Sequence, residues 1–192
     1  MGLGSGGASI IPALISSGAL DAPLFSLCLE LDGGAMTLGA IDTALHLGPP
    51  QWGPLSTAGF YVVQVNAITL VPSAAALGGP PSAVNGWGLS SPQAAQLPFV
   101  SMNSPHTIVD SGTSFTYVPT DVFNALVAAV ESYCSGGRCV GERVAVPNEG
   151  ICYRLAGPAA LSTFPGLIVE LQGGVTVDVA AQHLFINMGW EQ

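Results

Sequence analysis

Short apolar runs that alternate with polar positions dominate this chain and predict β-strands. The longest run, FYVVQVNAITL, covers residues 60–70. In a strand, one face of this run would hold Tyr61, Val63 and Val65, and the other face Val62, Gln64 and Asn66. Three shorter runs also predict strands, at residues 24–31, 33–41 and 106–110, and residues 166–179 predict a hairpin of two strands. The Gly-Gly pairs at 33–34 and 173–174 predict hairpin turns.

One stretch follows a helical period instead. Residues 119–133 (PTDVFNALVAAVESY) carry an apolar stripe made of Val122, Phe123, Leu126, Val127 and Val130. Thr120 is predicted to cap this helix, and Asp121 suits the positive helix N-terminus. Residues 71–105 are rich in Ala, Gly, Pro and Ser and are interpreted as a loop or expanded insertion. The sequence therefore predicts a mostly β chain with antiparallel sheets and one short helix at 120–133.

Composition narrows the class of function. Of the 192 residues, 49% are apolar, and 8% are charged against ~25% in an average soluble domain. Three basic and twelve acidic residues give a net charge of −9, which excludes a nucleic-acid-binding protein because phosphates need cationic partners. Residues 43–109 hold no Asp, Glu, Lys or Arg, yet Pro, Gly and polar residues interrupt them too often for a membrane span. Residues 1–20 are apolar but have no basic n-region of a signal peptide.

Residues 106–110 are predicted to form a short buried strand that ends at Asp110. The segment TIVDSGTSFTYVP at 107–119 places a tight turn directly after Asp110. Gly112 lets the backbone close there. The carboxylate is surrounded in sequence by the hydroxyls of Ser111, Thr113 and Ser114. Hydroxyl and backbone N–H donors orient a charged carboxylate, which suits a group that acts on a ligand or a water molecule.

An Asx turn, in which Asp110 caps its own backbone, is the alternative interpretation of this segment. For D-S-G alone we favour the Asx turn by about three to one. The wider context reverses that preference, because an apolar run precedes the motif and an aromatic stretch, a proline and a helix follow it.

In these surroundings, D-S-G-T-S resembles the second active-site segment of the pepsin-like aspartic proteases. Other segments also resemble that family: FSLCLE with GGAMTLGAID, GFYVVQVNAITL, CYRL, and FPGLIVELQGGVTVDVAAQHLFI. The similarity spans nearly all the chain apart from residues 71–105 and is closest to nepenthesin-, beta-secretase- and plasmepsin-V-like members. It implies the second lobe of an acid protease, with an extended polypeptide as substrate and no cofactor.

The resemblance also implies a role for each residue of the motif. Asp110 would be the second catalytic aspartate. Ser111 would join the hydrogen bonds that tie the two active-site loops together. Thr113 would bond the outer carboxylate oxygen, while Gly112 and Ser114 would face the substrate backbone.

The family's chemistry needs two carboxylates, and this sequence holds one D-[ST]-G motif. Asp32 precedes Gly33-Gly34 and is interpreted as part of a hairpin turn. The segment MGLGSGG resembles the [IM]-[LM]-G-L-G that follows the first lobe's active-site loop, and the family's closing I-L-G-D-type segment is not found. We therefore expect a chain truncated at both ends.

On this interpretation, residues 1–44 are a remnant of the first lobe with the inter-lobe strands, and residues 45–192 are an incomplete second lobe that carries the 71–105 insertion. The missing first lobe is the expected partner. A homodimer that brings together two Asp110 residues, as in the single-domain retroviral proteases, is an arrangement that we do not favour.

Four cysteines permit three full pairings. Cys134 and Cys139 flank SGGR and can pair with each other. The resemblance implies that Cys28 and Cys152 pair with cysteines beyond Gln192. No C-x2-C pair is present, so no zinc or other metal site is predicted.

The predicted function is aspartic-type peptide-bond hydrolysis, with the isolated chain inactive because it carries one catalytic Asp. The alternatives are a non-catalytic peptide- or protein-binding module of the same fold and an inactive fragment. The even number of cysteines fits an oxidising compartment. We therefore expect the secretory pathway, with an extracellular, vacuolar or lysosomal destination.

Overall fold

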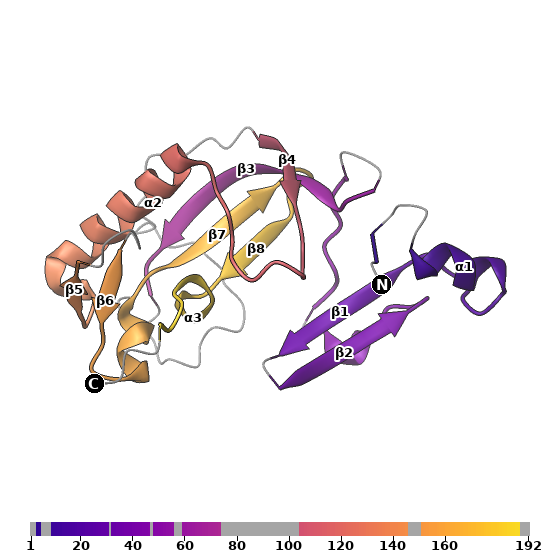
Figure 1. Ribbon diagram of the computed structural model, residues 1–192, viewed down its shortest axis with the longest axis horizontal. Coiled ribbons are helices and arrows are strands. Elements are labelled where there is room, and N and C mark those ends of the chain that lie inside the picture. Colours follow the sequence, from indigo (N-terminus) through magenta and orange to yellow (C-terminus); the bar gives the residue numbers. More distant parts are fainter. Residues whose placement is uncertain are drawn as a thin grey trace. The chain divides into compact units, whose positions relative to one another are not determined.

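The computed structural model describes residues 3–4, 9–30, 32–46, 48–55, 59–73, 104–145 and 151–188. Figure 1 shows its elements in chain order. They are α1 Ile10–Ser16, β1 Phe25–Glu30, β2 Gly33–Leu38, the 3-10 helix Thr43–Leu45, β3 Val62–Val71, β4 Ser104–Ile108, α2 Thr120–Tyr133, the π-type turn Cys134–Arg138, β5 Glu142–Val144, β6 Cys152–Arg154, the 3-10 helix Pro158–Thr163, β7 Gly166–Leu171, β8 Thr176–Val179 and α3 Ala181–Leu184. The predicted mostly β fold with antiparallel pairing is confirmed.

The described strands form three sheets. One has four strands in the order β4-β3-β7-β8, and the other two are the pairs β1-β2 and β5-β6. The chain divides into two compact units. The first unit comprises Met1–Gln64 and Pro105–Gly112, and the second comprises Val65–Ser104 and Thr113–Gln192.

Both predicted hairpins are confirmed, but the predicted first turn is wrong in its position, because Gly33 and Gly34 lie in β2 and pair with Glu30 and Leu29. Strand β1 pairs with β2 from Phe25↔Leu38 to Glu30↔Gly33, and β7 pairs with β8 from Leu167↔Val179 to Glu170↔Thr176. The second turn places Gly173 and Gly174 at φ 91° and 81°. This left-handed region is open mainly to glycine, so the Gly-Gly signal in the sequence has a direct backbone cause.

The predicted alternation along residues 60–70 does not describe the burial of strand β3. Val62 and Val65 are both buried, at 5% and 4% exposure, although the pattern assigned them to opposite faces. A strand can be buried on both faces where other parts of the chain cover both sides of its sheet, and alternation within one strand does not report such cover. The β3–β7 register also shifts between Val65 and Ala67, which leaves Asn66 as an exposed extra residue in a β-bulge.

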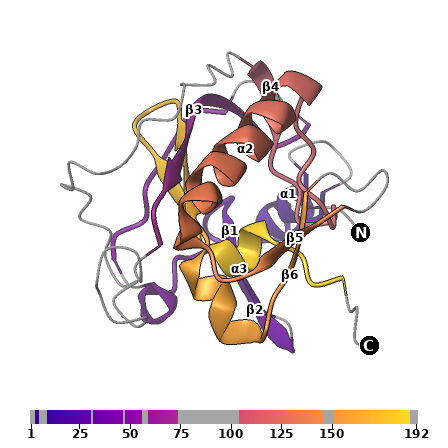
Figure 2. The same ribbon diagram turned by 90° about the vertical axis from the view of Figure 1, so that its left-hand side faces the viewer.

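Helix α2 covers one face of β3 and β7 within the second unit (Figure 1, Figure 2). Its buried residues pack in two clusters. Val122 packs with Val65, and Val130 and Tyr133 pack with Leu70 and Leu167. The helix bounds agree with the predicted 120–133.

Two details of the predicted helix are wrong. The N-cap is Pro119, with no side-chain hydrogen bond, and Thr120 is already the first helical residue. The cap position precedes the first helical residue, so the Thr120 side chain cannot serve there. Phe123 is 43% exposed and therefore lies outside the buried stripe. Asp121 does lie in the first turn, as predicted.

The sequence analysis did not predict helices α1 and α3. Helix α1 has seven residues and is capped by Ser9, whose Oγ accepts from the Ile11 N–H at 3.4 Å. Helices this short give too few turns for a period to stand out. Within the described residues, no helix is long and apolar enough to cross a membrane. Residues 74–103 of the predicted 71–105 loop lie outside the described residues. The predicted loop bounds are wrong at both ends, because Val71 is the last residue of β3 and β4 begins at Ser104.

Candidate active site

Asp110 lies on a turn that begins two residues after β4. The last backbone bond before it joins the Val109 N–H to the Tyr61 carbonyl at 2.9 Å. The Gly112 N–H donates to Asp110 Oδ1 at 2.8 Å. This bond between residues two apart forms an Asx turn. The Asx turn that was the alternative interpretation of the D-S-G segment is therefore present.

An Asx turn is compatible with a chemical role for the carboxylate. A carboxylate has about four acceptor positions on its two oxygens, so it can accept other hydrogen bonds besides the one from Gly112. A Cβ added at Gly112 would lie 3.2 Å from Asp110 Oδ1, so glycine permits this close approach. The turn therefore fixes one oxygen of Asp110 and restrains the orientation of the other.

The prediction that residues 106–110 form a buried strand ending at Asp110 is wrong in two respects. Strand β4 ends at Ile108, and Ile108 and Val109 are 51% and 59% exposed. Among the described elements, β4 lies at the end of the four-stranded sheet. An edge strand is paired along one side, so its residues lose part of the cover that a central strand has. Asp110 is consequently presented at an exposed edge.

The remaining motif residues are divided between the two units. Ser111 and Gly112 belong with Asp110 in the first unit, whereas Thr113 and Ser114 begin the second. All four are exposed. The expected approach of the Thr113 hydroxyl to the Asp110 carboxylate stays a prediction.

Sequence analysis did not identify Tyr61 as part of this site. Its carbonyl accepts the Val109 bond, and its hydroxyl donates to the Leu3 carbonyl at 2.6 Å. Burial raises the pKa of Tyr61 above its usual value of 10.0. Strand pairing brings residues 61 and 109 together, and a single sequence does not specify which strands pair. The only pointer to this residue in the sequence was its place near the start of the apolar run at 60–70.

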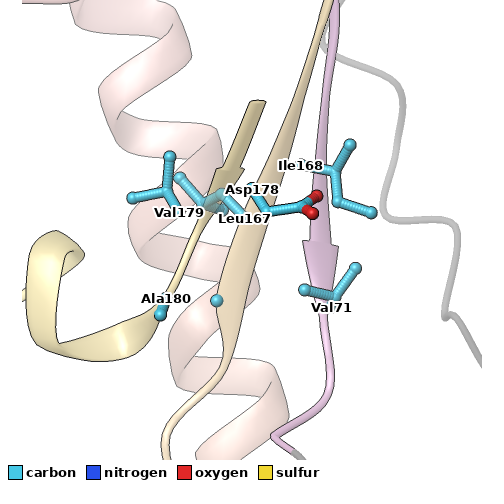
Figure 3. Close-up of a pocket in the computed structure, with 7 residues that line it drawn as sticks. Val71, Leu167, Ile168, Asp178, Val179 and Ala180 are labelled. Carbon is cyan, nitrogen blue, oxygen red and sulfur yellow. The ribbon is translucent and has the colours of Figure 1, made fainter. Parts of the chain in front are cut away.

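The described residues contain no cluster of three or more His, Cys, Asp or Glu side chains that could hold a metal ion. A cavity in the second unit has a volume of about 10 Å³ and is lined by β3, β7 and β8 residues (Figure 3). That volume is roughly what a single water molecule needs, so the cavity cannot hold a peptide.

The predicted disulfide between Cys134 and Cys139 is confirmed, with the two Cα atoms 4.9 Å apart. It closes the turn at the C-terminal end of α2, where the Arg138 guanidinium lies 5.4 Å from the centre of the Tyr133 ring. Cys28 and Cys152 are free thiols. Their expected pairing with cysteines outside this sequence stays a prediction.

Comparison with known protein families finds a match. Residues 83–192 match the family described as Xylanase inhibitor C-terminal. The chain belongs to this family. The family corresponds to the C-terminal lobe of pepsin-like aspartic proteases, which confirms the resemblance at that level. Its match begins inside the segment that was interpreted as an insertion.

The chain is also similar in sequence to several gastricsins. The chain is 27% identical to gastricsin from Macaca fuscata fuscata over 128 residues, which are 65% of this chain and 28% of that protein. It is 29% identical to gastricsin from Cavia porcellus over 134 residues, which are 67% of this chain and 28% of that protein. With human gastricsin the values are 28% over 120 residues, which are 60% of this chain and 25% of that protein. The chain thus spans about a quarter of the length of these curated relatives.

Proposed function

We propose that this chain is the second catalytic lobe of a pepsin-like aspartic endopeptidase and that Asp110 is its catalytic carboxylate. The observation that carries the proposal is the D-S-G turn, with the Gly112 N–H bond on Asp110 Oδ1. Membership of the Xylanase inhibitor C-terminal family and the likeness to gastricsins support it. The subfamily proposal, nearest to nepenthesin-, beta-secretase- and plasmepsin-V-like proteins, rests on the sequence alone.

The chemistry requires a second carboxylate close to Asp110. Two carboxyl groups about 3 Å apart cannot both ionise, so they share one proton. The ionised group takes a proton from a water molecule, and the protonated group donates a hydrogen bond to the peptide carbonyl. Water attacks the carbonyl carbon, and the proton later passes to the leaving amine. No cofactor enters this reaction.

In this proposal the other residues of the motif position the reacting groups. Ser111 contributes to the bonds between the two active-site loops, and Thr113 bonds the outer oxygen of Asp110. Gly112 and Ser114 face the backbone of an extended polypeptide substrate. The partner is a lobe that supplies the second aspartate, and the proposed location is the secretory pathway or the extracellular space.

The test is the substitution Asp110→Asn in an assembly that cleaves polypeptides and contains this chain. An amide cannot take or share the catalytic proton, so turnover should fall at least about 10³-fold. Substrate affinity should change far less. Asp178→Asn is the matched control, because Asp178 is an exposed carboxylate on β8. Near-normal turnover of the Asp110→Asn variant would show that Asp110 is not the catalytic group.

A second candidate function follows from the family's description. A non-catalytic lobe of this fold could bind and inhibit a xylanase, as the words xylanase inhibitor suggest. The two functions differ in their dependence on Asp110, because a binding surface does not need a catalytic proton. Titration of the chain into purified xylanase, followed by residual xylanase activity, tests this candidate. Inhibition that survives Asp110→Asn would favour the binding module over the protease.

A further inference from the structure

Tyr61 makes three contacts, one of which is with the segment that leads to Asp110. Its carbonyl accepts the Val109 N–H at 2.9 Å. Its hydroxyl donates to the Leu3 carbonyl at 2.6 Å. Its ring meets the Phe25 ring edge-on, with centroids 5.7 Å apart and planes at 69°. All of these residues belong to the first compact unit, together with Asp110.

Glycine at position 4 makes the contact with Leu3 geometrically feasible. A Cβ added to Gly4 would lie 2.9 Å from the carbonyl oxygen of Gly59. Any side chain there would push the 3–4 segment away from residues 59–61. The close approach keeps the Leu3 carbonyl within reach of the Tyr61 hydroxyl. Burial raises the pKa of Tyr61, so this hydroxyl stays protonated and able to donate at neutral and acidic pH.

These contacts continue without a break to the carboxylate. The Leu3 carbonyl accepts a hydrogen bond from the Tyr61 hydroxyl, and the Tyr61 carbonyl accepts one from the Val109 N–H. Asp110 is the residue after Val109. Gly112 then closes the turn on Asp110 Oδ1. The Val109 bond therefore lies one residue before that turn. Displacement of the Tyr61 backbone would therefore displace the base of the turn.

We propose that Tyr61 is a positioning residue for Asp110, acting through its hydroxyl bond to Leu3 and its carbonyl bond to Val109. The proposal rests on the proposed function, since it assigns Tyr61 to the machinery that orients the catalytic carboxylate. Tyr61 does not touch the reacting atoms. Its contribution is to hold the segment between β4 and Asp110 in one place, since an error of about 1 Å in the position of a catalytic group can cost a factor of 10² in rate.

The first experiment measures hydrogen exchange of individual amides by NMR in the complete 192-residue chain. Tyr61→Phe removes only the hydroxyl. If the hydroxyl restrains the turn, the Val109 and Gly112 amides should exchange roughly 3- to 10-fold faster, the range expected from losing one hydrogen bond. The Leu171 amide, which donates to Val175 in the second unit, is the internal reference and should not change.

The matched control is Tyr117→Phe, which removes a hydroxyl from a tyrosine that is 80% exposed. It should leave the exchange of Val109, Gly112 and Leu171 unchanged. Unchanged Val109 and Gly112 exchange in Tyr61→Phe would overturn the proposal. Equal acceleration of Leu171 would also overturn it, because Tyr61 would then contribute to general stability and not to the turn.

The second experiment separates this proposal from the proposed function. In an assembly whose turnover Asp110→Asn abolishes, Tyr61→Phe should lower kcat roughly 3- to 10-fold and leave KM within about twofold. A change in KM with normal kcat would place Tyr61 in substrate binding and reject the positioning role. If Asp110→Asn left turnover intact, the proposed function would fail, and the exchange data would still show whether Tyr61 restrains the turn.

Discussion

At the scale of single residues, the hydroxyl of Tyr133 is a buried polar group with defined partners. It accepts the Ser73 N–H at 3.3 Å and lies 3.5 Å from Ser73 Oγ. Both residues are buried, and no buried side-chain N or O atom of the described residues lacks a hydrogen-bond partner. Helix α2 is thereby tied to the residues that follow strand β3.

The substitution Tyr133→Phe should therefore destabilise the chain while keeping its ring packed against Leu70 and Leu167. Leaving the buried Ser73 groups without this partner should cost about 1–2 kcal/mol. The measurement is the free energy of unfolding in urea, with Tyr117→Phe as the exposed control that should change it by less than about 0.5 kcal/mol. Equal stability of the two variants would show that the Ser73 contact contributes nothing.

Residue by residue, the sequence was informative where a motif is local. The turn at Asp110 follows from D-S-G, because Asp and Gly favour this geometry within three residues. The contribution of Tyr61 could not be predicted, because it arises from contacts with Leu3 and Val109. These residues are distant from Tyr61 in the sequence, by 58 and 48 positions respectively. The exposure of Ile108 and Val109 was likewise hidden, since it depends on β4 being an edge strand.

At the scale of elements, the β7–β8 hairpin depends on a close backbone approach at its open end. Gly166 is buried at the start of β7, and a Cβ there would lie 2.7 Å from the Val179 carbonyl oxygen. Gly166→Ala should force the two strands apart and cost about 1–3 kcal/mol, as overpacking does. Chemical denaturation can measure this loss.

Gly157→Ala is the matched control for the hairpin. Its Cβ would meet nothing within 4 Å, and Gly157 has an extended backbone with φ at 169°. This variant should leave stability within about 0.5 kcal/mol of the parent. A Gly166→Ala variant as stable as Gly157→Ala would mean that the strands adjust without cost at this position.

Elements were predictable where one signal dominates. Helix α2 has a clear apolar period, the β7–β8 hairpin has a Gly-Gly turn, and the β1–β2 hairpin has a Gly-Gly pair directly after its turn. All three elements were found at nearly the right residues. Helix α1 was not predicted, because its seven residues make about two turns, which is too short for a helical period to stand out. The bulge at Asn66 depends on the pairing with β7, and the burial of both faces of β3 depends on what covers the sheet; periodicity within one strand reports neither.

At the scale of the whole molecule, the distribution of charge restricts the partners. The three basic residues of the sequence are Arg138, Arg143 and Arg154. Arg143 pairs with Glu131 and Arg154 with Glu142, while Arg138 lies over the Tyr133 ring. With a net charge of −9 and no lysine, the chain has no cationic surface for a polyanion. An extended polypeptide remains the substrate class that the proposed site requires.

The number of catalytic carboxylates leads to the final prediction, that the 192-residue chain alone does not cleave peptides. Its sequence has one D-[ST]-G motif, and a single carboxylate has no neighbouring acid to polarise the peptide carbonyl. Catalytic groups that act as a unit lose nearly all of their effect when one is absent. The purified chain should therefore show no inhibitor-sensitive cleavage of an unfolded protein substrate at any pH from about 3 to 7, with a pepstatin-like compound as the inhibitor.

A homodimer could supply two Asp110 residues, and its activity would grow with the square of chain concentration when only a small fraction of the chains is dimeric. Inhibitor-sensitive cleavage with that dependence would contradict the prediction and establish a dimeric enzyme.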